Sequence, residues 1–153
     1  MTPHLRLLAV AVSFLAPTIV TFAHEGATGP AKERMDLMGD MSKAMKDIYK
    51  HVSGNRDLPA IAELAGRIHA DAPKIPDLFP VGSGTGITDA KPEIWKSWDD
   101  FQAKVQKLED ESAALTSIAA SGDPKAIGAQ YTEVIHACTG CHTDYRRGRA
   151  DKL

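Results

Sequence analysis

Four stretches of the chain repeat apolar residues at intervals of three and four, and this spacing constrains the fold more than any other feature. The first stripe consists of Met35, Met38, Met41, Met45, Ile48 and Val52. Such spacing predicts an amphipathic α-helix over residues 31–52 that buries one face. Pro30 stands where a first-turn proline is tolerated, and Gly54 is expected to end the helix.

A second stripe, in residues 58–75, predicts another helix. Asp57 is suited to cap its N-terminus with a side-chain oxygen, and Pro73 and Pro76 are expected to end or bend it. The glycine-rich residues 77–95 follow, without the alternation of apolar and polar residues that is typical of a strand. We therefore expect a long connection there.

The third stripe predicts one long helix from about residue 92 to residue 120, capped by Thr88 or Asp89. Its expected inward positions are Trp95, Trp98, Phe101, Val105, Leu108, Leu115 and Ile118. Asp123 and Pro124 then form the start of a fourth helix. Four amphipathic helices without a strand candidate predict an all-α protein, folded as an antiparallel four-helix bundle.

The first 23 residues differ in character from the rest of the chain. Arg6 precedes an apolar run that ends in small residues around Ala23, which predicts a signal peptide over residues 1–23. The run is short and is interrupted by Pro17, so a membrane anchor is the weaker alternative. We expect residues 24–153 to form one domain in the periplasm, without membrane attachment after cleavage.

Charge and motif content exclude several classes of function. The 153 residues include 18 Lys and Arg against 20 Asp and Glu, so there is no basic excess of the kind that nucleic-acid binding requires. The sequence has no glycine-rich phosphate loop followed by Lys and Ser or Thr. Carboxylate pairs such as Asp99 and Asp100 fall on a polar helix face. We therefore do not expect an enzyme.

The only two cysteines, Cys138 and Cys141, lie near the end of the fourth predicted helix and are followed at once by His142. A disulfide between them would close a very short loop and stabilise the fold little. Structural zinc needs four ligands, and adjacent residues on a helix point about 100° apart, so Cys141 and His142 converge poorly on one ion. A redox dithiol normally stands at a helix N-terminus beside a βαβ unit.

The pattern Cys-x-x-Cys-His is also the attachment signature of c-type haem. Two thiols three residues apart lie along one face of a helix, where they can reach two vinyl groups of the porphyrin. The imidazole of the next residue can then reach the iron. We therefore expect one covalent haem c, held by Cys138 and Cys141, with His142 as an iron ligand on the C-terminal helix.

Three segments of the chain, taken together, resemble the class II c-type cytochromes, the family of cytochrome c-prime and its low-spin relatives. The first is Arg34-Met35-Asp36-Leu37-Met38. The second is Leu78-Phe79-Pro80 with the glycine-rich loop and Thr88-Asp89-Ala90-Lys91-Pro92-Glu93-Ile94-Trp95. The third is Cys138-Thr139-Gly140-Cys141-His142-Thr143-Asp144-Tyr145-Arg146.

The resemblance implies further roles for residues of this chain. It implies that Arg34 lies near the haem propionates, that Thr88 lies near the ring edge and that Met38 lies over the distal face of the iron. If the match between the first predicted helix and the family pattern is shifted by one turn, Met35 would be the iron ligand instead of Met38. A methionine stripe at helical spacing is also ordinary core packing, which we expect for Met41 and Met45.

The sixth iron position determines the expected function. With His142 and Met38 both bound, the haem is a periplasmic electron carrier whose potential the thioether raises. Without a sixth protein ligand, it is a five-coordinate protein that binds NO or CO. Redox proteins are the expected partners, and the basic residues Arg146, Arg147, Arg149 and Lys152 are a candidate docking patch for an acidic one. The resemblance also implies a homodimer. His24 is the expected N-terminal residue of the mature protein. Its amine and ring nitrogen could chelate copper, and the alternative is an ordinary disordered chain end.

Overall fold

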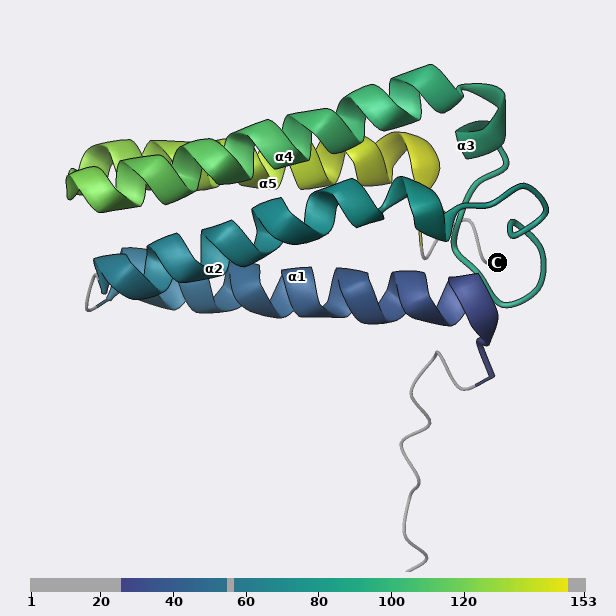
Figure 1. The fold of residues 1–153 in the computed structure, drawn as a ribbon, viewed down its shortest axis with the longest axis horizontal. Helices are drawn as coiled ribbons and strands as arrows, with labels where there is room; N and C mark the ends of the chain where they lie inside the picture. Colours follow the sequence, from purple (N-terminus) through teal and green to yellow (C-terminus); the bar gives the residue numbers. More distant parts are fainter. Residues whose placement is uncertain (1–25, 55–56, 149–153) are drawn as a thin grey trace, which may run out of the picture.

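The computed structural model describes residues 26–54 and 57–148, and its long helices lie side by side (Figure 1). They are α1 (Gly29–Ser53), α2 (Leu58–Asp71), α4 (Trp98–Ser121) and α5 (Pro124–Tyr145). Successive long helices run in opposite directions, so the expected all-α, antiparallel four-helix bundle is confirmed (Figure 1). The predicted signal peptide, residues 1–23, lies outside the described part of the chain.

The predicted helix starts agree with the structure at three of the four long helices. Pro30 stands in the first turn of α1. A carboxylate oxygen of Asp57 accepts a hydrogen bond from the backbone N of Ala60 at 3.0 Å, and Asp123 accepts one from Lys125 N at 2.9 Å. These caps satisfy backbone donors that the first helical turn leaves without partners.

The prediction of one helix over residues 92–120, capped by Thr88 or Asp89, is wrong. The short helix α3 (Glu93–Lys96) ends at Ser97, which has φ −123° and ψ 51°, and α4 begins at the next residue. Ser97 serves both helices, because its N donates to Glu93 O at 2.9 Å and its O accepts from Phe101 N at 3.0 Å. The break changes the direction of the chain. Thr88 and Asp89 do not cap a helix, and their carbonyl oxygens accept hydrogen bonds from Arg147 instead.

Prolines shape the end of α2 as predicted. Two 3₁₀ turns follow the helix, Ala72–Lys74 and Pro76–Leu78, each with a proline in its first positions. Residues 79–92 then form the connection to α3, which Figure 1 shows at the same end of the bundle as the start of α1. Within the described chain the only strand-like pairing is an isolated antiparallel bridge between Ala90 and Arg146.

The core lies where the inward faces of the helices meet. Ile48, Ile61, Ile68 and Leu115 are almost completely buried, and burying such side chains stabilises the fold by about 1.5–3 kcal/mol each. Of the predicted inward residues, Trp95, Trp98 and Ile118 are only partly buried against this core. The neighbouring pairs α1–α2, α2–α4 and α4–α5 pack closely, whereas α1 and α5 contact each other at few points.

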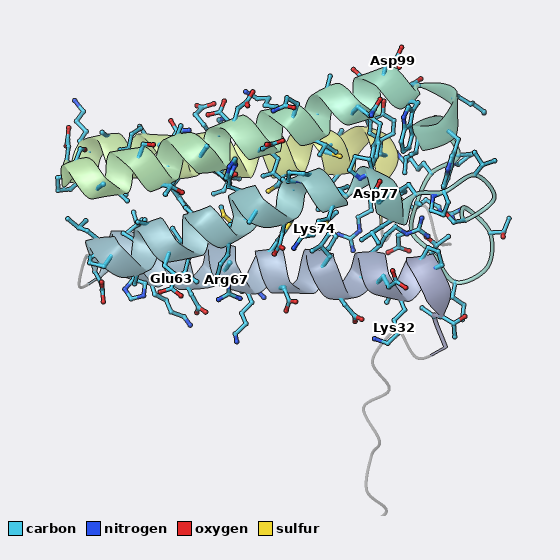
Figure 2. The ribbon with its side chains drawn as sticks, viewed as in Figure 1. Lys32, Glu63, Arg67, Lys74, Asp77 and Asp99 are labelled. Carbon is cyan, nitrogen blue, oxygen red and sulfur yellow. The ribbon has the colours of Figure 1, made fainter. Side chains whose placement is uncertain are left out.

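The outer faces of the helices are charged. Figure 2 labels six exposed side chains that belong to this surface: Lys32, Glu63, Arg67, Lys74, Asp77 and Asp99. Among the described residues, no helix combines the length and the apolar character that crossing a bilayer would require.

Candidate functional site

The weak contact between α1 and α5 leaves a cavity of about 1050 Å³ between them. This volume is slightly above the roughly 300–1,000 Å³ that is usual for ligand pockets. Residues of α4 and the loop 86–90 also line the cavity. All six predicted site residues border it: Arg34, Met38, Thr88, Cys138, Cys141 and His142.

The α1 wall of the cavity is built from the methionine stripe. Met35, Met38, Met41 and Met45 all line the cavity, because the spacing of three and four places them on one face of the helix. Met41 is buried among core residues, and the other three are half-buried. Met41 and Met45 therefore pack with the core, as predicted, and also line the cavity.

The α5 wall carries the Cys-x-x-Cys-His motif in the last two turns of the helix. Cys138 and Cys141 are half-buried free thiols, and His142 is exposed at the cavity rim. Burial raises the pKa of Cys138, and it raises the pKa of Cys141 to about 11. Both thiols are therefore held in the neutral form at physiological pH.

The environment of His142 favours its neutral form as well. The residue is exposed, but the surrounding protein desolvates part of its ring, and the positive charge of Arg146 adds to this effect. Both causes lower the pKa of His142. A neutral imidazole has a free nitrogen lone pair, which is what metal ligation needs.

The geometry disagrees with the other uses of a Cys-x-x-Cys motif. The described residues contain no cluster of three or more His, Cys, Asp or Glu side chains that could hold a metal ion, which disfavours zinc. A redox dithiol needs thiols of lowered pKa, usually at a helix N-terminus. Here the thiols have raised pKa values and lie near a helix C-terminus.

The other three histidines of the described chain, His51, His69 and His136, do not line the cavity. The ring Nδ1 of His69 on α2 lies 3.2 Å from the carbonyl oxygen of Glu109 on α4. His136 is exposed on α5, with its Nδ1 3.6 Å from a carboxylate oxygen of Glu133. His24 lies outside the described residues.

A buried cation stands at the mouth of the cavity. Arg34 is only 5% exposed, and its guanidinium carbon lies 4.5 Å from the centre of the Phe79 ring. Its nitrogens donate to neutral oxygens of Ser83 and Thr88. Within the described chain no carboxylate oxygen lies within 4 Å of this guanidinium, so its charge lacks a counter-ion there.

Aromatic side chains close the cavity at the loop end of the bundle. Phe101 lies at the centre, with ring centroids at 4.9 Å from Phe79, 5.4 Å from Trp98 and 5.4 Å from Tyr145. Gly84 leaves room for the ring of Trp95, since a Cβ on this glycine would lie 2.5 Å from that ring. Phe79, Phe101 and Tyr145 of this cluster line the cavity, so its wall is aromatic there.

Sequence reasoning did not include Lys104 in the site. Its Nζ lies 2.9 Å from an oxygen of Asp144 and 3.9 Å from one of Asp100, and the side chain lines the cavity. The hydrogen bond to Asp144 is the main cause that raises the pKa of Lys104. Its spacing from Phe101 and Leu108 places it on the inward face of α4, and this signal could have identified it.

The residues present fit a haem. The cavity has a mostly apolar lining, two thiols and an imidazole on one wall, thioethers on the opposite wall and a buried cation at its mouth. Thiols can bond to the ring, an imidazole can ligate iron, and a buried guanidinium can pair with a carboxylate substituent of the ring.

Comparison with known proteins agrees with this geometry. The family model described as Cytochrome C' matches residues 30–146. The chain is 32% identical to cytochrome c-556 of Agrobacterium fabrum over 78% of this chain and 82% of the relative. It is 29% identical to cytochrome c′ of Rhodospirillum rubrum over 92% of this chain and 96% of the relative.

A solved structure similar to the chain is a nitric oxide complex of a cytochrome c prime variant from Alcaligenes xylosoxidans. The TM-score is 0.70 at 26% identity, and the match covers 78% of this chain and 94% of that one. The chain belongs to the cytochrome c′ family of class II c-type cytochromes, and its cofactor is a covalently attached haem c with iron.

Proposed function

We propose that this protein is a periplasmic electron carrier whose iron is held by His142 on one side and Met38 on the other. The observation that carries the proposal is that both residues line one cavity from facing helices. A thioether and an imidazole together bind iron in both oxidation states. Electron transfer then proceeds without a change of ligands, and the thioether raises the reduction potential.

The motif residues attach the cofactor in this proposal. The S–H groups of Cys138 and Cys141 add across two vinyl groups, so each thiol forms a C–S bond and passes its hydrogen to the neighbouring carbon. The three-residue spacing places both sulfurs on one face of α5. His142, with its lowered pKa, offers a neutral nitrogen to the iron.

Arg34 is proposed to pair with a propionate of the ring. The support is its burial together with the lack of a carboxylate near it in the described chain. An unpaired buried charge is expensive, and a carboxylate of the cofactor compensates for it. Thr88, which borders the same end of the cavity, is proposed to lie near the ring edge.

A five-coordinate, gas-binding haem is the second candidate. A relative of known structure was solved as its nitric oxide complex, which favours this reading. Three further methionines of α1 border the cavity beside Met38: Met35, Met41 and Met45. If none of these sulfurs binds the iron, the distal side is an apolar chamber into which NO or CO can enter.

The Met38→Leu variant separates the two candidates, because leucine fills a similar volume without a donor sulfur. We expect wild-type ferric protein to be low-spin, with the weak far-red band of a methionine–iron bond. The variant should become high-spin, lose this band and bind CO in the ferrous state. Optical spectra of both oxidation states, before and after CO, measure these changes.

Met35→Leu is the matched control for the ligand assignment. The variant should keep the wild-type spectrum if Met38 is the ligand. Loss of the far-red band in Met35→Leu alone would show that Met35, one turn before Met38, is the iron ligand. A wild-type protein that is high-spin and binds CO at once would contradict the electron-carrier proposal and favour the gas binder.

Export is part of the proposal, supported by the sequence of residues 1–23 and by the haem attachment expected outside the cytoplasm. Sequencing the N-terminus of haem-loaded protein from a periplasmic extract should give His24 as the first residue. Retention of residues 1–23 in a membrane fraction would instead indicate an anchor. Redox proteins are the proposed partners, and the homodimer remains a prediction of family resemblance.

A further inference from the structure

The loop that contains Thr88 joins α1 to the end of α5 across the mouth of the cavity. The hydroxyl oxygen of Thr88 accepts hydrogen bonds from Arg34 Nη2 at 3.3 Å and from Ala90 N at 3.1 Å. Its carbonyl oxygen accepts one from Arg147 Nη2 at 2.9 Å. One residue therefore contacts the side chain of an α1 residue and that of a residue just past α5.

The α5 side of this link is a short piece of strand pairing. Arg147 N donates to Asp89 O at 2.8 Å, and Lys91 N donates to Tyr145 O at 2.9 Å. The Nζ of Lys91 adds a hydrogen bond to Thr143 O at 3.0 Å. These bonds fix residues 89–91 to the chain immediately after His142.

The α1 side of the link is the buried guanidinium of Arg34. Its Nη1 donates to Ser83 Oγ at 3.2 Å and its Nη2 to Ser83 O at 2.8 Å, in addition to the bond to Thr88. Arg34 lies one turn before Met38, and residues four apart share a helix face. Fixing Arg34 therefore fixes the part of α1 that presents the Met38 sulfur.

Direct contact between α1 and α5 is sparse. The hydrogen bonds through Thr88 are therefore important for the position of α1 relative to α5. Elsewhere the two helices meet through the Tyr131 hydroxyl, which lies 3.4 Å from Met45 O, and through the rings of Tyr49 and Tyr131. At the loop end the separation of the helices depends on Arg34, Thr88 and Arg147. A small displacement there changes the distance between the Met38 sulfur and the iron.

We infer that Thr88 is a positioning residue, which holds α1 at the separation from α5 at which Met38 reaches the iron. The inference rests on the proposed His142–Met38 ligation. Removing the hydroxyl leaves two donors, Arg34 Nη2 and Ala90 N, without this partly buried acceptor, and the loss favours local rearrangement. The first turns of α1 then move, and the bond between Met38 and the iron weakens.

Thr88→Val tests this inference, because valine has the same shape as threonine without the hydroxyl. In haem-loaded protein we expect a weaker far-red methionine–iron band and a rate of CO binding to the ferrous form that rises about tenfold. Tenfold is the effect of losing roughly one buried hydrogen bond. Amide hydrogen exchange over residues 29–38 should also accelerate, since this part of α1 is held less firmly.

Two further variants make the test specific. Thr88→Ser retains the hydroxyl and should restore the band and the slow CO rate. Thr85→Val removes an exposed hydroxyl of the same loop, which donates only to Gly82 O at 3.4 Å, and should behave as wild type. A change in Thr85→Val equal to that in Thr88→Val would overturn the inference, since general loosening of the loop would then explain both.

The outcomes distinguish the inference from the proposed function. A low-spin wild type with an unchanged Thr88→Val variant overturns the positioning role and leaves the electron carrier intact. A high-spin wild type contradicts the His142–Met38 ligation itself, and the positioning role fails with it. A low-spin wild type with selective loss of the band in Thr88→Val supports both.

Discussion

At the residue scale, buried polar groups with defined partners distinguish this site from an ordinary helical core. Tyr145 is an example: it is only 6% exposed, and its hydroxyl donates to a carboxylate oxygen of Asp100 at 2.6 Å. Its ring packs on Phe101, and its carbonyl oxygen accepts the bond from Lys91 N. One residue thus connects α4, α5 and the loop beside the motif, through its side chain and its backbone carbonyl.

Tyr145→Phe should lower the free energy of unfolding by about 1.5–3 kcal/mol, the usual value of a hydrogen bond to a charged group. Desolvation, together with the bond to Asp100, raises the pKa of Tyr145 to about 12, above its ordinary value of 10.0. The native state therefore holds this proton more tightly than the unfolded state. The corresponding stability is present below about pH 10 and is lost as the pH rises toward 12.

Urea unfolding of haem-loaded protein at several pH values measures both effects. The difference between wild type and Tyr145→Phe should shrink as the pH rises from about 10 to about 12. Tyr49→Phe is the matched control, because Tyr49 is 57% exposed and its ring contact with Tyr131 is retained. An equal loss of stability in both variants would refute the role of the buried bond.

At the element scale, each helix boundary has a local cause that can be tested separately from the site. Ser97 separates α3 from α4, so that Trp95 packs against Gly84, while Trp98 and Phe101 contact each other one turn apart within α4. Gly122 ends α4 with φ 80°, a conformation that favours glycine. Asp123 caps α5 at the end opposite the motif.

Asp123→Ala should lower the free energy of unfolding by about 1 kcal/mol, because Lys125 N loses its capping acceptor. Thermal unfolding followed by circular dichroism measures the loss, and Asp123→Ser, which keeps a capping oxygen, should retain most of the stability. The haem spectrum should be the same in all three proteins. A changed spectrum in Asp123→Ala would mean that the start of α5 controls the distant motif.

At the scale of the whole molecule, stability and cofactor are coupled. Three helix pairs pack closely, and the fourth, α1 with α5, is separated by a cavity of about 1050 Å³ with a mostly apolar lining. A covalent group that makes apolar contacts only in the folded state stabilises that state. The covalent haem is therefore expected to supply the contacts that the helices themselves do not make.

The double variant Cys138→Ala/Cys141→Ala should lose covalent haem and unfold at a lower temperature. The free energy of unfolding should fall, because the folded variant lacks the contacts that the haem makes across the cavity. Mass spectrometry measures attachment, and circular dichroism measures the melting temperature. The melting temperature of the single variant Cys138→Ala should lie between those of the wild type and the double variant. Equal stability of all three proteins would contradict the coupling.

Much of this architecture could be predicted from the sequence, because its causes are short-range. The methionine stripe defines a helix face, Asp57 and Asp123 cap helices beside them in the chain, and the Cys-x-x-Cys-His spacing describes a single helical segment. Each of these features depends on residues within a few turns of one another. The family and its covalent haem followed from the same local patterns.

Other features were decided only by the tertiary structure. Ser97 breaks the predicted helix, and Thr88 bonds to Arg34 and lies near Arg147 instead of capping that helix, because contacts between distant segments outweigh the local preference. The sequence determined which residues point inward. The packing of all four helices together decided which pair, α1 and α5, stays apart to hold the cofactor, since that choice depends on the summed contacts of every helix face.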